Sequence, residues 1–421
     1  MRVAGIRSMM IRKCICLLVI VFVGCSQEQE PANLSRIPSV NSSPNAYVES
    51  PPAGDRQEGD SSSELTTVPI EQEEVAVQST TDAQLAEEMV KSYRAAAIQG
   101  DSEAQFNLGM SYQFGKGVSQ DYKEALKWFR KAAEQGYAKA QYCLGKSYHV
   151  GAGVPQDTKE ALKWYIKAAE QGYLEAQCFL GGVYLLGKGV PEDTKEALKW
   201  YTKAAEQGNA EAQYFLGLIY NDGEGVPQDY KAVVKWHRKA AEQEYADAQF
   251  SLGLMYSRGL GVPQDDKVAA KWFRKAAEQG NAEAQLCLGM MYNDGKSVPQ
   301  DYKEAAKWFR KAAEQGQAGA QLCLGMMCLV GEGVPQDDKE AAKWFRKAAE
   351  QGNAEAQYGL AVMYHDGQGV LEDYAEAYKW LILAGMNGHK DAPMRKKELR
   401  RNMTPSQVEE AQRRAKAFLE R

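Results

Sequence analysis

The chain has 421 residues, of which 44% are hydrophobic and 25% are charged, a composition typical of soluble globular proteins and not of multi-pass membrane proteins. The formal net charge of −5 is unevenly distributed, because the first 24 residues carry four bases and no acid, whereas residues 26–82 carry eleven acids and two bases. The rest of the chain is therefore neutral, which argues against nucleic acid as a partner, since nucleic-acid binding needs a basic face or stripe.

The chain begins with basic residues and continues with an apolar stretch, Cys14–Val23, that is about half as long as a bilayer-spanning segment. This pattern predicts an export signal over residues 1–24. Its end, from Phe22 to Ser26, resembles a bacterial lipobox, which implies that Cys25 becomes lipidated and is the first residue of the mature protein. Phe22 stands where leucine is usual, so an ordinary cleaved signal and a short uncleaved anchor remain alternatives.

Lipidation of Cys25 would anchor the chain to a bacterial membrane and place the remainder in the periplasm or at the cell surface. Ser26 is compatible with sorting to the outer membrane. Residues 25–82 are rich in Ser, Pro, Glu and Gln and show no sustained hydrophobic period. They predict a disordered acidic tether with a root-mean-square span of roughly 40 Å.

A 36-residue repeat occupies residues 101–388, and its eight copies follow one another without a change of register. Each copy contains one tryptophan: Trp128, Trp164, Trp200, Trp236, Trp272, Trp308, Trp344 and Trp380. In the fourth copy, apolar residues recur with helical spacing, first at Ala212 and Leu216 and then at Trp236 and Ala240. Each copy therefore predicts a pair of amphipathic helices, called here the first and the second helix of a repeat.

Clear signals mark where the second helices begin and end. Asp157, followed by Glu160, has the spacing of a capping box just after a Val-Pro turn, and the same pair recurs in other copies. A glycine such as Gly136 follows the helix and predicts a left-handed C-cap. Glu244 replaces that glycine in one copy, so we expect strain or fraying at this junction.

Another glycine recurs inside the first helices, where it costs about 1 kcal/mol relative to alanine. Such a glycine is tolerable only where two backbones approach closely, which we therefore expect at these positions. The positions are Gly109, Gly145, Gly181, Gly217, Gly253, Gly289 and Gly325.

This arrangement resembles the Sel-one-like repeat family, a relative of the tetratricopeptide repeats. The residues that carry the resemblance in the second copy are Ala140, Leu144, Gly145, Tyr148, Gly151, Gly153, Val154, Asp157, Ala161, Trp164, Ala168, Ala169 and Gly172. The resemblance implies an all-α fold, a right-handed α-solenoid of helix-turn-helix repeats with a concave groove. Departures from the family pattern are Ser119 for Pro, Ser297 for a loop Gly, Cys328 for Tyr and Ala361 for the helix Gly.

Both ends of the array carry patterns that predict caps, which a solenoid needs to shield its terminal repeats from water. Residues 83–100 match a lone second helix and predict an N-terminal capping helix. Residues 389–421 predict C-terminal capping helices, because Thr404 and Gln407 have capping-box spacing with Pro405 at the first helical position.

Residues that would indicate catalysis or metal binding are sparse. The four histidines lie far apart, and none has a metal-ligand spacing with Cys or another His. We therefore expect no metal and no small-molecule cofactor. Five cysteines remain after the signal region, Cys143, Cys178, Cys287, Cys323 and Cys328. They lack the one-disulfide-per-repeat pairing of cysteine-rich relatives, so we expect them to be small buried apolar residues.

Positions that differ between the copies are free to recognise a partner. The sixth, tenth and thirteenth positions of each copy share one face of the first helix. By analogy with tetratricopeptide repeats, this face would line the groove and bind a protein or peptide. The predicted partner-binding residues are Tyr142, Tyr214, Phe250, Tyr358, Leu218, Leu254, Met290, Met326, His149, Asn221, Asn293 and His365. An alternative is that the sixth and tenth positions belong to the core.

The sequence as a whole predicts a non-catalytic, exported scaffold that binds another protein or peptide and touches the membrane only through its lipid. Two alternatives remain. One is a cell-wall-directed hydrolase or β-lactamase-like enzyme, an activity attributed to cysteine-rich relatives, for which the sequence shows no nucleophile, base and oxyanion arrangement. The other is a peptidoglycan-binding module.

Overall fold

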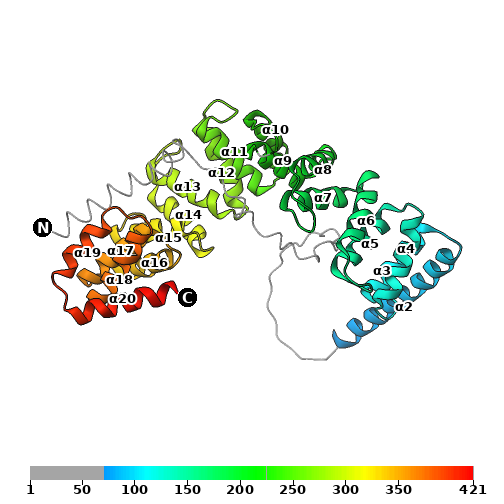
Figure 1. Ribbon diagram of the computed structural model, residues 1–421, viewed down its shortest axis with the longest axis horizontal. Coiled ribbons are helices and arrows are strands. Elements are labelled where there is room, and N and C mark those ends of the chain that lie inside the picture. The colour runs from blue at the N-terminus through cyan, green and yellow to red at the C-terminus, as the bar shows by residue number, and fades with distance from the viewer. Residues whose placement is uncertain (1–70, 224, 421) are drawn as a thin grey trace, which may run out of the picture. The chain divides into compact units, whose positions relative to one another are not determined.

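The computed structural model describes residues 71–223 and 225–420. The predicted signal peptide over residues 1–24, the lipidation site Cys25 and the predicted tether as far as residue 70 lie outside the described residues. The described part of the chain contains helices and no strand (Figure 1). None of these helices is both long and apolar enough to cross a bilayer.

The described residues form two compact bodies. The N-terminal body contains α2 (Glu71–Ile98), α3 (Ser102–Phe114), α4 (Tyr122–Glu134), α5 (Ala138–Val150), α6 (Thr158–Glu170), α7 (Leu174–Leu186) and α8 (Thr194–Glu206). The C-terminal body contains α9 (Ala210–Asp222), α10 (Tyr230–Glu242), α11 (Ala246–Arg258), α12 (Asp266–Glu278), α13 (Ala282–Asp294), α14 (Tyr302–Glu314), α15 (Ala318–Val330), α16 (Asp338–Glu350), α17 (Ala354–Asp366), α18 (Tyr374–Met386), α19 (Ala392–Arg400) and α20 (Pro405–Leu419).

Within each body, every helix of the repeats packs against the helix before it and the helix after it in sequence (Figure 1). First and second helices therefore alternate, which is the predicted solenoid of helix-turn-helix repeats. Small and aliphatic residues recur at the contacts and are completely buried, as at Ala240, Ala248 and Leu252. The burial of these side chains stabilises each repeat only against its neighbours, as expected of a solenoid.

The second helices begin at an aspartate, as predicted, but without the expected capping box. Asp193 accepts hydrogen bonds from the backbone N–H groups of Lys195 and Glu196 at 3.0 and 3.1 Å. Its own N–H donates to the Tyr184 carbonyl at 2.9 Å, so this group is not available to the glutamate side chain. Glu196 instead pairs with Lys199 at 2.9 Å. The aspartate cap is confirmed and the reciprocal half of the capping box is wrong.

The glycine inside the first helices of the first seven repeats makes room for a ring. A Cβ added at Gly253 would lie 2.6 Å from Cε1 of Phe273, the residue that follows Trp272. At Gly109 the same ring atom of Phe129 would lie at 2.6 Å, and the nearest backbone atom, the Ala125 carbonyl O, at 3.3 Å. The expected close approach is therefore present, but its main cause is an aromatic side chain and not a second backbone.

A buried glutamine at the fifth position of each repeat ties three helices together. Gln249 of α11 donates through Nε2 to the Ala241 carbonyl of α10 at 3.1 Å, and its Oε1 accepts from Nε2 of Gln279, after α12, at 2.8 Å. The same two bonds recur at Gln105, Gln141, Gln177, Gln285 and Gln321. Both polar ends of a buried amide are thus satisfied, which avoids a desolvation penalty of about 1–3 kcal/mol.

The N-terminal cap differs from its predicted bounds. Helix α2 begins at Glu71, which places residues 71–82 in a helix and not in the tether as predicted. The reason is that the segment from residue 71 to residue 78 consists mainly of Glu, Gln and Ala, residues of high helix propensity. Val90 and Ala97 of α2 are buried, and the helix packs on α3.

Helices α19 and α20 cover the C-terminal end of the array by packing on α18. The predicted capping box at the start of α20 is confirmed, with both the Thr404 and the Gln407 hydrogen bonds present. Arg414 of α20 pairs with Asp373 at 3.0 Å and with Glu376 at 3.1 Å, at the start of α18. These ion pairs attach the cap to the last repeat.

Glu244 adopts the left-handed conformation that glycine has at the corresponding junctions, with φ of 64°. Its N–H still donates to the Ala241 carbonyl, and the Tyr245 N–H donates to the Ala240 carbonyl, both at 3.1 Å. The junction therefore carries the expected backbone strain and retains its hydrogen bonds. Ser297 also has a left-handed φ, 66°, in a loop where Gly261 and Gly333 occupy the same position of other repeats.

Candidate partner-binding surface

The third, sixth, tenth and thirteenth positions of a repeat lie on one side of its first helix, because residues three and four apart share a helix face. This surface is called here the first-helix face. Ten of the twelve predicted partner-binding residues are partly exposed on it. The sixth-position residues combine this exposure with ring contacts to the scaffold, and these contacts hold them in place.

In the N-terminal body, the face contains Tyr142 and His149 of α5. The Tyr142 ring lies 5.4 Å from the ring of Tyr165 and 5.3 Å from that of Tyr173. His149 meets Phe179 edge to face at 5.5 Å. Burial raises the pKa of Tyr142 to about 12, with a further contribution from the neighbouring Cys143. The Tyr142 hydroxyl therefore stays protonated at neutral pH.

In the C-terminal body, three aromatic residues hold the sixth position. Tyr214 lies 5.2 Å from the ring of Tyr245, Phe250 lies 5.8 Å from Phe273, and Tyr358 is stacked on another ring at 4.1 Å. Each of the three remains partly exposed. Aromatic side chains fixed in this way lose little conformational entropy when a partner binds, which favours them as anchors.

The remaining predicted residues of the C-terminal body are also partly exposed, except for two. Leu218, Leu254, Asn221, Asn293 and His365 all reach the surface. Nδ1 of His365 lies 2.6 Å from a carboxylate oxygen of Asp366, and Asn293 donates to Asp294 at 3.1 Å. The Asn and His side chains supply polar groups beside the aromatic residues of the sixth position.

Met290 and Met326 are exceptions, because only 3% and 8% of their surfaces are exposed. Both belong to one hydrophobic cluster that also contains Leu286 and Phe309. Their inclusion among the partner-binding residues was wrong, and the alternative of a core role applies to them. Flexible methionine side chains fill gaps in such cores.

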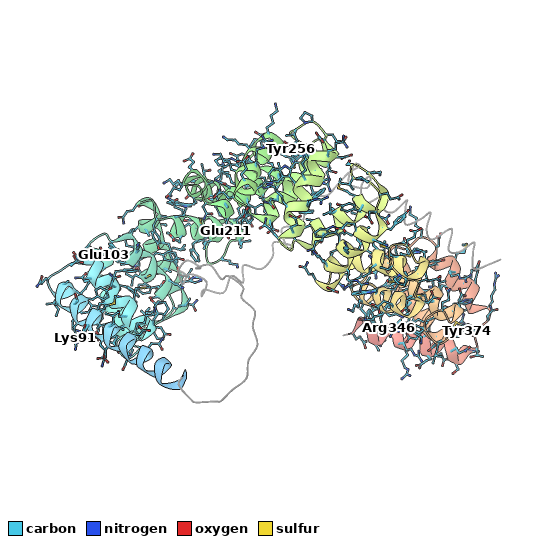
Figure 2. All side chains as sticks on the ribbon, turned by 180° about the vertical axis from the view of Figure 1, so that it is seen from behind. Lys91, Glu103, Glu211, Tyr256, Arg346 and Tyr374 are labelled. Atoms are coloured by element: carbon cyan, nitrogen blue, oxygen red, sulfur yellow. The ribbon has the colours of Figure 1, made fainter. Side chains whose placement is uncertain are left out.

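An acidic residue stands one helical turn before the aromatic anchors, and sequence reasoning missed it. Glu211, Asp247, Glu283 and Glu355 hold the third position of four first helices. Glu211 lies at the start of α9 (Figure 2). The signal in the sequence that predicts these residues is their spacing of three from the sixth position, which places both on one helix face.

The carboxylates of Glu211 and Asp247 affect the pKa values of the tyrosines that lie between them in the sequence, Tyr214 and Tyr245. Burial, with smaller contributions from the negative charges of Glu211 and Asp247, raises the pKa of Tyr245 to about 12. Burial and Asp247 also raise the pKa of Tyr214. Burial raises the pKa of Glu211 as well. The cluster of Glu211, Tyr214, Tyr245 and Asp247 therefore joins aromatic rings and carboxylates in one region between α9 and α11.

One serine–histidine pair lies beneath this region. Oγ of Ser251 is 2.7 Å from Nδ1 of His237, and Nε2 of His237 is 3.1 Å from the Tyr214 carbonyl O. His237 is 1% exposed, and burial lowers its pKa to about 4. A histidine with this pKa is a weak base, and the partner of its second nitrogen is a peptide carbonyl and not a carboxylate. The pair lacks the features of an activated nucleophile.

The cysteines and potential metal ligands show no reactive arrangement in the described part of the chain. Burial raises the pKa of the Cys143 thiol to about 12, and burial also raises the pKa of Cys328, so both stay protonated at neutral pH. Among the described residues, no group of three or more His, Cys, Asp and Glu side chains is placed to hold a metal ion.

Comparison with known proteins identifies the repeat. The family model described as Sel1 repeat matches eight consecutive segments, residues 102–137, 138–173, 174–209, 210–245, 246–281, 282–317, 318–353 and 354–389. The chain belongs to the Sel1 repeat family. The segments correspond to the eight copies of the 36-residue period, each displaced by one residue from the predicted bounds of 101–388. Sel1 repeat proteins are in general scaffolds for protein–protein interaction and are typically not catalytic.

Two solved structures of Sel1 repeat proteins are similar over most of the chain. A Sel1 repeat protein from Oxalobacter formigenes is 40% identical, covers 73% of this chain and 90% of its own, and has a TM-score of 0.61. The protein c5321, a protective antigen present in uropathogenic Escherichia coli strains, is 35% identical, covers 79% of each chain, and has a TM-score of 0.54. No curated protein matches the chain.

Proposed function

We propose that this Sel1 repeat protein is a non-catalytic scaffold of the bacterial cell envelope that binds a partner protein or peptide along its first-helix face. The observation that supports this proposal is the row of partly exposed aromatic residues, such as Tyr214, Phe250 and Tyr358, each packed against scaffold rings. Residues of this kind supply most of the free energy of binding at protein interfaces. The family's general role in protein–protein interaction points the same way.

Photocrosslinking in cells tests the binding surface. A benzoylphenylalanine residue at the position of Tyr214 or Leu254 is expected to form covalent adducts with a partner, because both positions are partly exposed on the first-helix face. The adducts are detected by immunoblotting and identified by mass spectrometry. The same residue at Lys271, which is exposed on the second helix α12, is the control. Equal adduct formation at all three positions would contradict the proposal.

We propose further that the chain is exported and anchored through a lipid on Cys25 in the outer membrane, with the repeats in the periplasm or at the cell surface. The support is the amino-terminal pattern of basic residues, a short apolar stretch and a Cys after Gly24. The acyl chains of a lipoprotein exceed the two-signal threshold for stable membrane anchoring.

Metabolic labelling with an alkyne analogue of palmitate tests the anchor. The wild-type protein is expected to incorporate the label and to sediment with membranes. The Cys25→Ser variant is expected to lose the label, because no other residue at the end of the apolar stretch can accept the lipid. A Cys14→Ser variant, altered within the apolar stretch, serves as the control and should keep the label. Full labelling of Cys25→Ser would exclude the lipoprotein assignment.

A further inference from the structure

Acidic and basic side chains are segregated between the first and second helices of the C-terminal body. Its first helices α9, α11, α13, α15 and α17 contain one basic residue besides histidine, Arg258. Their acids are Glu211, Asp222, Asp247, Glu283, Asp294, Glu355 and Asp366. The second helices α10, α12 and α14 are instead rich in Lys and Arg. The first helices of this body are thus acidic although residues 83–421 as a whole are neutral.

In the part of the chain that the structure describes, the acids at the third position have no Lys or Arg partner. In the described part of the chain, no Lys or Arg forms an ion pair with Glu211, Asp247, Glu283 or Glu355. Asp247 accepts from the neutral amide of Asn281 at 2.8 Å, and Glu355 lies 3.2 Å from a histidine nitrogen. Some acids near the start of second helices do have such a partner, since Glu304 pairs with Lys307 at 2.8 Å.

Each of these acids adjoins the aromatic row or an apolar residue. Glu211, Asp247 and Glu355 lie one turn before Tyr214, Phe250 and Tyr358, and Glu283 lies one turn before Leu286. A carboxylate and an aromatic ring that lie side by side both attract a cation, the carboxylate through its charge and the ring through its negative face. The third-position acid occurs in four of the five repeats of this body, on separate helices, and α15 has Gly319 in its place. A series of carboxylates on separate helices suits an extended chain better than a single ion.

We infer that the first-helix face of the C-terminal body binds a cationic segment of a partner protein, in which Lys or Arg side chains alternate with apolar ones. The cationic groups would pair with the third-position carboxylates, and the apolar groups would contact the sixth-position and tenth-position residues, including Leu218 and Leu254. Charge complementarity of this kind speeds association and excludes acidic competitors. The inference rests on the proposed function and specifies the chemistry of the partner.

Fluorescence anisotropy with defined peptides tests this inference on the full-length chain. The probe is a fluorescein-labelled peptide built of Lys-Leu-Gly-Ser repeats, and a second probe carries Glu in place of each Lys. The test variant combines Glu211→Gln, Asp247→Asn, Glu283→Gln and Glu355→Gln. The control variant combines Glu242→Gln, Glu278→Gln, Glu314→Gln and Glu350→Gln, which removes the same charge from exposed ends of second helices. Circular dichroism verifies the folding of both variants.

The lysine probe is expected to bind the wild-type chain and the control variant alike, and to bind the test variant on the order of tenfold more weakly. Added salt should weaken binding to the wild-type chain, because the carboxylates are partly exposed; this measurement needs no variant. Equal affinity of the two variants for the lysine probe, equal binding of the glutamate probe, or binding that salt leaves unchanged would each overturn the inference.

Crosslinking separates this inference from the proposed function. If the position of Tyr214 captures a partner in cells and the test variant captures it equally well, the scaffold function stands and the cationic partner is excluded. If no position on the first-helix face captures a protein while the lysine probe still binds through the four carboxylates, the proposed function fails and the charge preference of the face stands.

Discussion

Replacement of Gly253 by alanine is expected to destabilise the C-terminal body by about 2 kcal/mol, although alanine is the better helix former. The added Cβ would lie 2.6 Å from Cε1 and 2.7 Å from Cδ1 of Phe273, closer than any van der Waals contact allows. The ring cannot retreat, because Phe273 is 1% exposed and packed on all sides. Urea unfolding followed by circular dichroism measures the change.

A second substitution in the same body provides the control. Gly385 also lies within a helix, but a Cβ there would come no closer than 3.9 Å to Pro393, so Gly385→Ala should leave stability unchanged or raise it by up to about 1 kcal/mol. The eighth repeat shows how the clash is avoided, since it has Ala361 in the glycine position and Leu381 where other repeats have a ring. Adding Phe273→Leu to Gly253→Ala should therefore recover part of the lost stability. A Gly253→Ala variant as stable as Gly385→Ala would contradict this account.

Acidification is expected to destabilise the C-terminal body through His237. Burial lowers the pKa of this histidine from 6.5 to about 4. Above pH 6.5 the histidine is neutral in both the folded and the unfolded chain, and its contribution to stability is fully present. As the pH falls from 6.5 through 4, the unfolded chain binds a proton that the folded chain excludes. The free energy of unfolding then decreases by about 3 kcal/mol in all.

The neighbouring repeats suggest the matched variant. Phe273 and Phe309 hold the position of His237 in the next two repeats, and each is followed 14 residues later by a cysteine, Cys287 or Cys323, at the position of Ser251. The polar pair of His237 and Ser251 is thus replaced there by an apolar pair. The double variant His237→Phe and Ser251→Cys should fold and should lose this acid sensitivity between pH 6.5 and pH 4. Thermal unfolding over this pH range measures the effect, and an unchanged pH dependence in the double variant would assign the sensitivity to other groups.

Much of the fold could be predicted because one period governs it. The tryptophan spacing, the Asp caps and the glycine C-caps all recur at the same interval, so local signals support one another. The start of α2 lies outside the period, and the predicted start at residue 83 is twelve residues later than the observed start at Glu71. Where no capping residue is present, helix propensity alone decides where a helix begins, and propensity does not mark a single residue as the start.

The binding surface is harder to predict, because helix spacing shows which residues share a face and does not show how deeply each of them is buried. Leu254 and Met290 hold the same position of neighbouring repeats, yet Leu254 is partly exposed and Met290 is 3% exposed. Burial here depends on side chains of adjacent repeats, which vary in size. The acids at the third position could not be predicted for a different reason, since in sequence they resemble ordinary solvated charges. Only the structure shows that Glu211 has no Lys or Arg partner among the described residues and that its charge acts on Tyr245.

The buried glutamines at the fifth position of the repeats have a consequence for how such a protein changes in length over evolution. Each amide bonds to groups 8 and 30 residues away, as Gln249 does with Ala241 and Gln279. At the C-terminal end of the array, Asn387 takes the place of the second glutamine and donates to Gln357 at 3.0 Å. Deletion or duplication of one whole period leaves every buried glutamine with equivalent partners. A deletion or insertion of any other length would leave a buried amide without its hydrogen-bond partners. Recombination between near-identical repeats can therefore lengthen or shorten the array in whole copies while both caps stay intact.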